Sequence, residues 1–190
     1  MLEMILRDSI KAMWLLWFVY WIVAAGRAKA TRWREPVLIR VVDVMLFLCA
    51  ASLLVARRWF PFILAAQFLG PGIVLPIIGT AATALGLGLA TWARVYLGRN
   101  WSGTVTLKEE HALIRTGPYA RVRHPIYSGM LLALLGAVLA IGEWRVLIAF
   151  LLVLAAFVRR VLAEEKYLRE IFPQYVAYSR ETAALIPRLF

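Results

Sequence analysis

Long apolar segments separated by short polar ones dominate the chain, and they set the predicted architecture. Five segments are candidates for membrane helices: residues 10–25, 37–56, 72–97, 126–141 and 146–158. A helix needs about 20 residues, within a range of about 17–25, to cross a hydrocarbon core of about 30 Å. The second and third segments reach that length, the first reaches it with its flanks, and the last two are short.

The two short segments are joined only by residues 142–145, which predicts a tight helical hairpin. Two arrangements stay open for this hairpin: full spans, or tilted or shallow helices that the other helices shield. Beyond residue 158 the helical pattern continues to Phe172 and becomes amphipathic, and a short second piece follows at residues 174–183. We therefore expect an all-α integral membrane protein with about five transmembrane helices and C-terminal amphipathic helices.

Composition supports this class, because 63% of the 190 residues are hydrophobic and only 17% are charged. Soluble domains average about 45–50% apolar and about 25% charged residues, which disfavours a soluble helical domain. The length fits a single membrane domain, residues 1–190, with three transmembrane helices in residues 1–97. A cleaved signal peptide is the alternative for the first segment, but Glu3 and Asp8 dilute its basic region and its tryptophans suit a retained helix.

The formal net charge of +11 follows the expected membrane topology. Sixteen Lys and Arg residues fall on one side of the five segments and five fall on the other. By the positive-inside tendency we expect the N-terminus outside, and residues 111–127 and the C-terminus in the cytoplasm. Because the basic residues flank apolar spans instead of forming one solvated face, the lipid bilayer is the expected partner and nucleic acid is not.

Metal and disulfide chemistry is poorly supplied in this chain. It has one cysteine, Cys49, which lies in an apolar run, and two histidines in total. A single cysteine cannot form an intrachain disulfide or a cysteine metal cluster, and two histidines are few for a metal site. We therefore expect no metal.

Two features inside the apolar segments have structural explanations. Arg40 and Asp43 are three residues apart on one helical face, so we expect them to pair and thereby reduce the cost of charge in the membrane. Gly79, Gly86 and Gly88 place small residues along one helix, which favours close helix packing.

Polar chemistry concentrates in two places that are expected on the same membrane face. Residues 111–127 contain both histidines, three arginines and two of the eight prolines. Arg160, Glu164 and Glu165 form the second group, in which Arg160 and Glu164 are four apart and share a helical face. Their plainer explanations are a helix start at residues 124–125 and a surface salt bridge at a helix end. Residue chemistry alone predicts a cytoplasmic-face pocket for a small polar ligand, with a substrate that arrives from the bilayer.

An ordered pattern across both groups carries a family resemblance. The pattern is His111-x-Leu113-x3-Gly117-x-Tyr119-x3-Arg123-His124-Pro125-x-Tyr127, then Arg160-x3-Glu164-Glu165-x2-Leu168, then Phe172-x2-Tyr175-x2-Tyr178. It resembles the isoprenylcysteine carboxyl methyltransferase family, which is related to the membrane phospholipid N-methyltransferases. The preceding Leu97-Gly-x-Asn-Trp-Ser102 also looks like the prokaryotic members. The resemblance covers roughly residues 97–190 and implies a methyltransferase core in residues 98–190.

The resemblance implies S-adenosylmethionine, with S-adenosylhomocysteine as product, in an enclosed cytoplasmic pocket. It places the family's substrate-side, catalytic arginine on Arg160, and gives Glu164 a catalytic and cofactor-holding role. The implied cofactor contacts fall on His111, Ala112, Leu113, Ile114, Tyr119, His124, Pro125, Ile126, Tyr127 and Glu164. The chain departs from the eukaryotic members at Ala112, where they tend to have glutamate, and at residues 161–163, where they are more acidic.

The expected function is methyl transfer to a lipidic or membrane-delivered acceptor, by in-line displacement at a sulfonium methyl. A carboxylate acceptor, such as a prenylcysteine α-carboxyl, is already a nucleophile and needs no general base. A phospholipid amine or a thiol is the alternative acceptor, and would need deprotonation, for which His124 and Glu165 are the candidates. Less favoured alternatives are a nicotinamide-dependent membrane reductase and a membrane partner without catalytic activity.

Overall fold

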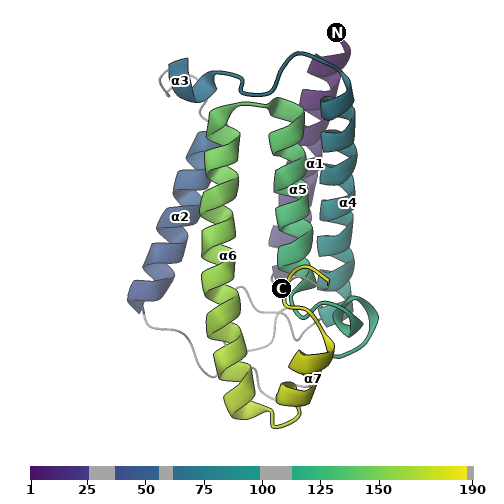
Figure 1. The fold of residues 1–190 in the computed structure, drawn as a ribbon, viewed down its shortest axis with the longest axis vertical. Helices are drawn as coiled ribbons and strands as arrows, with labels where there is room; N and C mark the ends of the chain where they lie inside the picture. Colours follow the sequence, from purple (N-terminus) through teal and green to yellow (C-terminus); the bar gives the residue numbers. More distant parts are fainter. Residues whose placement is uncertain (26–36, 56–61, 99–112, 188–190) are drawn as a thin grey trace.

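The computed structural model describes residues 1–25, 37–55, 62–98 and 113–187, and these form an all-α arrangement (Figure 1). The elements are α1 (Leu2–Ala25), α2 (Val37–Val55), α3 (Phe62–Ala65), α4 (Val74–Leu97), the 3-10 turn η3 (Gly117–Ala120), α5 (Pro125–Ile141), α6 (Trp144–Ile171) and α7 (Tyr175–Glu181). The five predicted apolar segments are all helices, so the predicted fold class is confirmed. The first begins at Leu2 instead of residue 10, and the four-residue α3 was not predicted.

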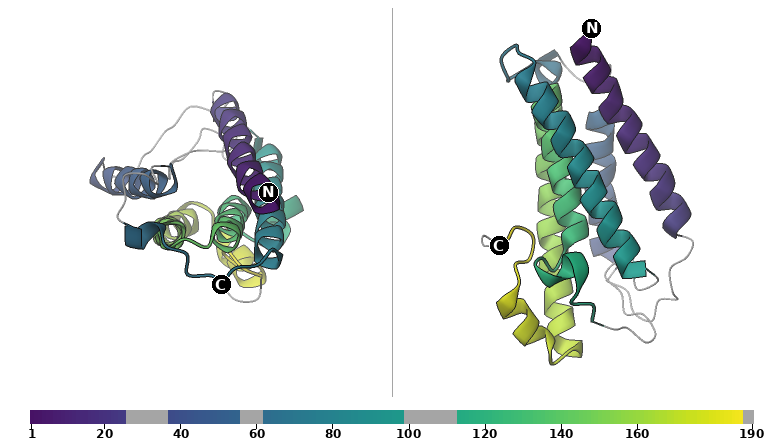
Figure 2. Two further views of the ribbon diagram at one scale, coloured as in Figure 1. Left: turned by 90° about the horizontal axis from the view of Figure 1, so that it is seen from above. Right: turned by 90° about the vertical axis from the view of Figure 1, so that its right-hand side faces the viewer.

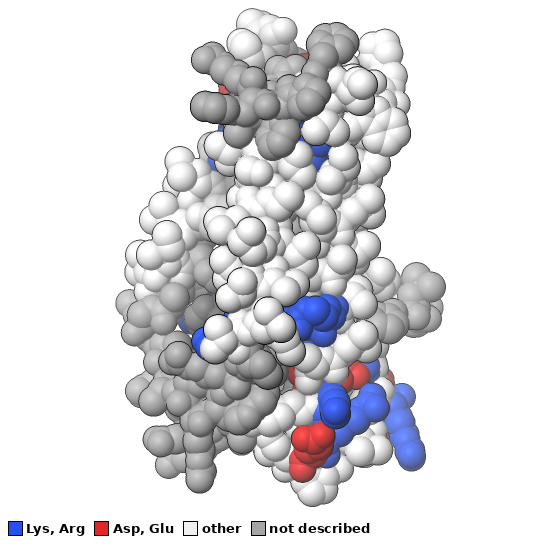
Figure 3. Space-filling view, turned by 90° about the vertical axis from the view of Figure 1, so that its left-hand side faces the viewer, with Lys and Arg blue, Asp and Glu red and all other residues white. Residues whose placement is uncertain are grey.

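Three helices of the described chain, α2, α4 and α6, are long and apolar enough to cross a membrane. The helix α5 is apolar but has 17 residues, as the short fourth segment suggested. On the face formed by α2 and α6, charged side chains gather toward one end, beyond a broad uncharged band (Figure 3). The chain is therefore a multi-pass membrane protein, while the number of spans beyond these three stays a prediction.

The hairpin of α5 and α6 is tight, as predicted, and its geometry explains the sequence there. Gly142 follows α5 with φ 69° and donates its backbone N–H to Val138 O at 2.9 Å, which is a left-handed helix cap. Such a cap favours glycine because a side chain is strained at positive φ. Glu143 then adopts an extended conformation and directly precedes α6, which begins at Trp144. The chain thus reverses direction within two residues.

The closest helix packing joins α4 to α5, and it depends on glycine. A Cβ at Gly86 would lie 2.4 Å from Ala133 N, and a Cβ at Gly79 would lie 2.4 Å from Gly136 O. The hydroxyl of Thr83 donates across this contact to Ala133 O at 3.1 Å. These distances confirm the predicted packing role of Gly79 and Gly86. A Cβ at Gly88 would meet nothing within 4 Å, so Gly88 is not part of this contact.

The remaining helices flank this pair on different sides (Figure 2). The helix α1 packs on α4 and α5 through Trp17, which contacts a cluster of Leu87, Ala90 and Ala133. The helix α2 lies beyond α6, on the side away from α4 (Figure 1). The helix α6 extends past the other helices at one end and leads into α7, which folds back toward the start of α5. That end holds the polar residues singled out in the sequence.

Candidate functional site

The start of α5 positions the first group of polar side chains. Pro125 occupies the first helical position, which suits a residue without a backbone N–H, and His124 is the residue that precedes the helix. His124 is 7% exposed, and Pro125 and Ile126 are buried with it. The predicted helix start at residues 124–125 is therefore correct. This helix end is buried in the protein instead of being exposed to solvent.

His124 contacts both carboxylates of the second group. Its Nδ1 lies 3.2 Å from Glu164 Oε2, and its Nε2 lies 3.6 Å from Glu165 Oε1. Burial alone would lower the pKa of His124, but hydrogen bonds and charge from Glu164 and Glu165 outweigh burial and raise it. The sequence predicted that both polar groups, residues 111–127 and Arg160 with Glu164 and Glu165, lie on one membrane face. They meet at His124.

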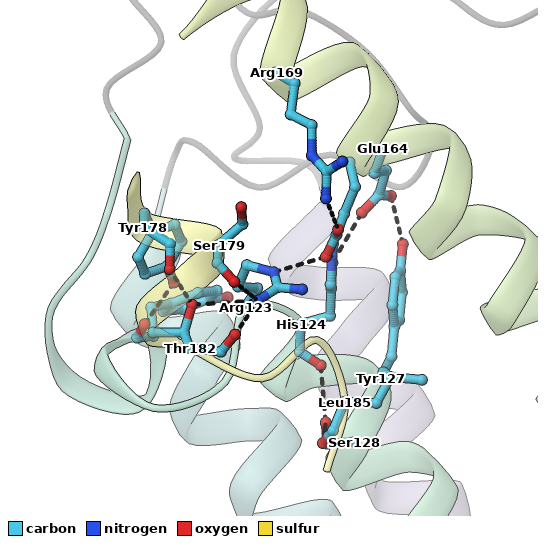
Figure 4. Close-up of polar contacts among 12 residues, drawn as sticks. Arg123, His124, Tyr127, Ser128, Glu164, Arg169, Tyr178, Ser179, Thr182 and Leu185 are labelled. Atoms are coloured by element: carbon cyan, nitrogen blue, oxygen red, sulfur yellow. Dashed lines mark hydrogen bonds and ion pairs between the residues drawn. The ribbon is translucent and has the colours of Figure 1, made fainter. Parts of the chain in front are cut away.

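Glu164 is shared between His124 and Tyr127 (Figure 4). The Tyr127 hydroxyl donates to Glu164 Oε1 at 2.7 Å, while His124 faces the other oxygen. The Tyr127 ring stacks on Phe157 with centroids 4.6 Å apart, and lies parallel to His124 at 5.7 Å. Packing and hydrogen bonds thus hold one carboxylate in a fixed orientation at the end of the apolar core.

The side chain of Arg160, which lies one helical turn before Glu164 on α6, points toward α2. Its Nε donates to Asp43 Oδ2 at 2.7 Å, and Arg159 Nε donates to Asp43 Oδ1 at 3.0 Å. The predicted pair of Arg40 and Asp43 is therefore wrong. Asp43 is 1% exposed and faces α6, where two guanidinium groups take its oxygens, whereas Arg40 Nε has no hydrogen-bond partner among the described residues. Spacing within one helix did not reveal this stronger partner on the facing helix.

Arg123 links the start of α5 to α6 and α7, a role that the sequence pattern did not predict. Its Nε donates to Glu165 Oε1 at 2.7 Å, and its Nη1 donates to Ser179 O at 3.0 Å and also to Thr182 O. Glu165 also accepts from Arg169 Nη2 at 3.2 Å. One feature of the sequence could have predicted this role. Arg123 directly precedes His124 in the motif, and an arginine buried there needs a carboxylate partner.

Residues 182–185, which we call the C-terminal strap, complete this end of the bundle. The backbone N–H groups of Arg123 and His124 donate to Ala183 O at 2.8 Å and Ala184 O at 3.0 Å. The Ser128 hydroxyl donates to Leu185 O at 2.6 Å. The strap therefore satisfies backbone groups that precede α5 and would otherwise be buried without partners.

Three buried tyrosines pack beside the strap. Tyr119 is 7% exposed, its hydroxyl donates to Ala93 O at 3.3 Å, and burial raises its pKa. Tyr178 donates to Tyr119 O, and burial raises the pKa of Tyr178 to about 12. Tyr175 is buried, and no hydrogen-bond partner is found for its hydroxyl within the described chain.

Other residues of the predicted cofactor site are placed only in part. Ile114 packs against Tyr119, Ala93 and Ile126, and Leu113 is half-buried beside it. His111 and Ala112 lie outside the described residues. The structure thus brings together Tyr127, His124, Glu164 and Arg160, while Tyr119, Pro125 and Ile126 lie in the packing behind them.

This set of groups fits a small ligand that carries hydroxyl groups and a positive charge. Glu164 supplies a negative charge and oxygen acceptors, and its side chain is 21% exposed. His124 is buried between Glu164 and Glu165 and adds an imidazole to this end of the apolar core. S-adenosylmethionine has this chemistry, so the residues present fit the cofactor that the sequence pattern implied.

Comparison with known proteins finds a family and several relatives. The family model described as "Phospholipid methyltransferase" matches residues 74–175, more than half of the chain. A protein-S-isoprenylcysteine O-methyltransferase of Saccharomyces cerevisiae is 34% identical over 115 residues, which are 58% of this chain and 48% of that protein. The cobalt-zinc-cadmium resistance protein CzcN of Cupriavidus metallidurans is 34% identical over 113 residues, 55% of this chain and 47% of that protein.

A solved structure supports the same fold. The eukaryotic intramembrane Ras methyltransferase ICMT superposes with a TM-score of 0.54 at 23% identity, over 80% of this chain and 52% of that one. At this identity the likeness concerns the fold alone. The chain spans about half the length of the curated relatives it matches.

Proposed function

Because this chain belongs to the phospholipid methyltransferase family, we propose that it is an integral membrane enzyme that transfers a methyl group from S-adenosylmethionine to a lipidic acceptor. The observation that carries the proposal is the contact of buried His124 with half-buried Glu164 and Tyr127, next to Arg160 at the end of the apolar core. A carboxylate, an imidazole and a cation meet there in a place that is largely closed to water.

When bound, S-adenosylmethionine supplies an electrophilic methyl group on a positively charged sulfur. Glu164 and His124 would hold this cofactor, with further contacts from Tyr127 and from the segment that includes Leu113 and Ile114. The hydrogen bond from Tyr127 and the contact with His124 fix the carboxylate of Glu164 before any ligand arrives. Such pre-organisation saves the cost of ordering the side chain on binding.

Arg160 would orient the acceptor. Its guanidinium emerges from α6 beside Tyr127 and next to α2, where a lipid-borne group can approach from the bilayer. We propose a carboxylate acceptor, and the printed names of the isoprenylcysteine O-methyltransferase relatives support this choice. A carboxylate is already ionised, so the protein has to position it and exclude water instead of removing a proton.

We further propose that the N-terminus faces the outside and that the site and the C-terminus face the cytoplasm. The excess of Lys and Arg on the side that holds residues 111–127 and the end of α6 supports this orientation. Cysteine-accessibility labelling in intact cells, with single cysteines introduced at each end, would test it.

Calorimetry with S-adenosylhomocysteine on detergent-purified protein tests the cofactor, and a labelled-methyl transfer assay on a lipid extract tests the reaction. We expect saturable binding and a labelled lipid whose mass rises by one methylene. Binding of NADPH without binding of S-adenosylhomocysteine would overturn the proposal. A labelled amine or thiol product would keep the methyltransferase but overturn the carboxylate acceptor.

A further inference from the structure

The feature of interest is the contact that α2 makes with Arg160. Asp43, in the second turn of α2, is 1% exposed and accepts from the Nε atoms of Arg159 and Arg160 at 3.0 and 2.7 Å. A carboxylate buried this deeply in a membrane helix is costly unless it is paired, and such residues usually have a functional partner. Its partner here includes the arginine proposed to orient the acceptor.

The same helix also contacts the flat face of Arg160. The guanidinium carbon lies 5.3 Å from the centre of the Phe47 ring, one turn along α2 from Asp43. Phe47 in turn lies 5.7 Å from Phe157, on which Tyr127 stacks at 4.6 Å. One turn of α2 therefore supplies both a charge at the edge of the guanidinium and a ring beneath it.

Together these contacts fix the direction of the Arg160 side chain. Arginine has a planar fork of donors whose recognition of a carboxylate depends on the orientation of that plane. A carboxylate at Nε and a ring on one face define both the plane and its tilt. A shift of about 1 Å in a positioning group can cost about 100-fold in rate, so this fixation matters for an acceptor that Arg160 must orient.

We propose that Asp43 is a positioning residue that holds Arg160 in the orientation needed to receive the acceptor. The inference rests on the proposed function, in which Arg160 orients the acceptor. It extends the site to α2, which precedes residues 74–175, the part that the family model matches. Acceptor affinity would then depend on a helix outside the segment that defines the family.

A purely structural role for Asp43 makes a different prediction. The other end of α2 is held independently, because Arg145 Nη1 donates to Leu53 O and Leu54 O at 2.7 Å each. Along its length, Ala50 and Leu53 also pack into a core with Phe157. Loss of the Asp43 carboxylate should therefore remove one of the groups that orient the Arg160 side chain without detaching α2.

The test compares four variants of the full chain in detergent: D43N, D43E, R159Q and the double variant D43N with R159Q. Two readouts are used. The first is the KM for N-acetyl-S-farnesylcysteine, measured beside the KM for S-adenosylmethionine and kcat. The second needs no acceptor: phenylglyoxal modification of Arg160, followed by peptide mass spectrometry. The affinity for S-adenosylhomocysteine serves as the check that each variant is folded.

For D43N we expect the acceptor KM to rise about 10- to 100-fold and Arg160 to become reactive, while S-adenosylhomocysteine affinity stays within about twofold. D43E should recover part of the loss, because it restores a carboxylate one methylene longer. R159Q removes the other cation on Asp43 and should leave the acceptor KM near the wild-type value. The double variant restores the charge balance but not the contact, so its KM should stay high.

Three results would overturn the proposal: continued protection of Arg160 in D43N, an unchanged acceptor KM in D43N, or full recovery in the double variant. Recovery there would mean that charge balance, and not positioning, is the role of Asp43. A wild-type protein that binds no S-adenosylhomocysteine and transfers no methyl group would overturn the proposed function instead. The modification readout would still report in that case whether Asp43 holds Arg160.

Discussion

Both ends of α6 hold buried charges, but the charges are used in different ways. At the hairpin end, where Gly142 and Glu143 join α5 to α6, Arg145 donates to Glu143 and to two backbone carbonyls at the end of α2. Arg7 donates there to Ile141 O at 3.3 Å. At the site end, where His124 meets α6, the contacts of Glu164 are with the side chains of His124 and Tyr127.

The difference separates an ion cluster that holds helix ends from the group that we propose to be functional. Carbonyl groups at helix ends lack helical partners, and an arginine that donates hydrogen bonds to them completes the fold. Arg145 does this for α2, and Arg7 does it for α5. At the site end, by contrast, the partners of Glu164 are side chains, and the Glu164 side chain stays 21% exposed. Burial of charge alone would not have distinguished the two ends.

The largest effect is expected from the hairpin end. Replacement of Arg145 by methionine leaves Glu143, which is 1% exposed, without its closest cation. Loss of one partner of a buried ion pair costs about 3–5 kcal/mol, which should appear as lost stability in detergent unfolding. The folded fraction should still bind S-adenosylhomocysteine as the wild type does, and weaker binding by that fraction would remove the distinction between the ends. A double variant, Arg145→Met with Glu143→Leu, should recover much of the stability.

A smaller effect on stability, but a direct one on binding, is expected from Glu164→Gln. The change keeps the shape and the Tyr127 hydrogen bond but removes the charge that faces His124. We expect a loss of about 2–3 kcal/mol in S-adenosylhomocysteine affinity, or roughly 30- to 150-fold, measured by calorimetry. Tyr127→Phe is the matched control and should cost about 0.5–1.5 kcal/mol, since it removes one neutral donor. Equal affinities for Glu164→Gln and the wild type would exclude Glu164 from the cofactor site.

Next in size is a pH dependence that belongs to the site end. Glu164 and Glu165 raise the pKa of His124, with Arg123 and Tyr127 as the other polar groups that surround it. A raised pKa means that protonated His124 stabilises the fold fully below its unfolded value of about 6.5, and that this contribution is lost as the pH rises through the higher folded value. The unfolding temperature should therefore fall as the pH increases above about 6.5.

A matched pair of variants sharpens this prediction. His124→Gln should flatten the dependence, whereas Arg145→Met should lower the whole curve and keep its slope. A wild-type unfolding temperature that rises between about pH 6.5 and 8 would contradict the assigned direction.

The smallest effect is expected from a surface pair near the site end. Arg115 Nη2 lies 3.3 Å from Glu181 Oε2, with the two side chains 41% and 68% exposed. Such pairs contribute about 0–1 kcal/mol and are screened by salt. Glu181→Gln should thus change stability by less than about 0.5 kcal/mol in urea or heat unfolding. A larger loss would show that exposure is a poor guide to the role of charges in this protein.

The helices were predictable because period and apolar length are local properties of the sequence. The continuation of α6 to Ile171 and the cap at Gly142 follow from the same local rules. The partner of Asp43 was not predictable in this way, because the choice between Arg40 and the arginines of α6 depends on which helices face each other. The contacts near the start of α1 were not predictable either, since Arg7 finds its acceptors at Ile141, the last residue of α5, and at Glu143, which precedes α6.

At the site, the motif predicted which residues lie together, but not all of the contacts that they make. It grouped His124, Tyr127 and Glu164, which do meet, but gave no sign that Arg123 binds Glu165 and the strap. Arg160 and Glu164 lie one turn apart as expected, yet Arg160 reaches Asp43 on another helix. The assignment of cofactor and acceptor roles to these residues stays a prediction.

The C-terminal strap has a consequence for the order in which the protein is made. Ser128, in the first turn of α5, bonds to Leu185, which is 57 residues further along the chain. At about 5–20 residues per second, the ribosome delivers Leu185 about 3–11 s after Ser128. During that interval the segment before α5 is in the nascent chain without the carbonyl groups that later receive its N–H donors. The helices can thus be inserted early, whereas the site is assembled among the last steps of biosynthesis.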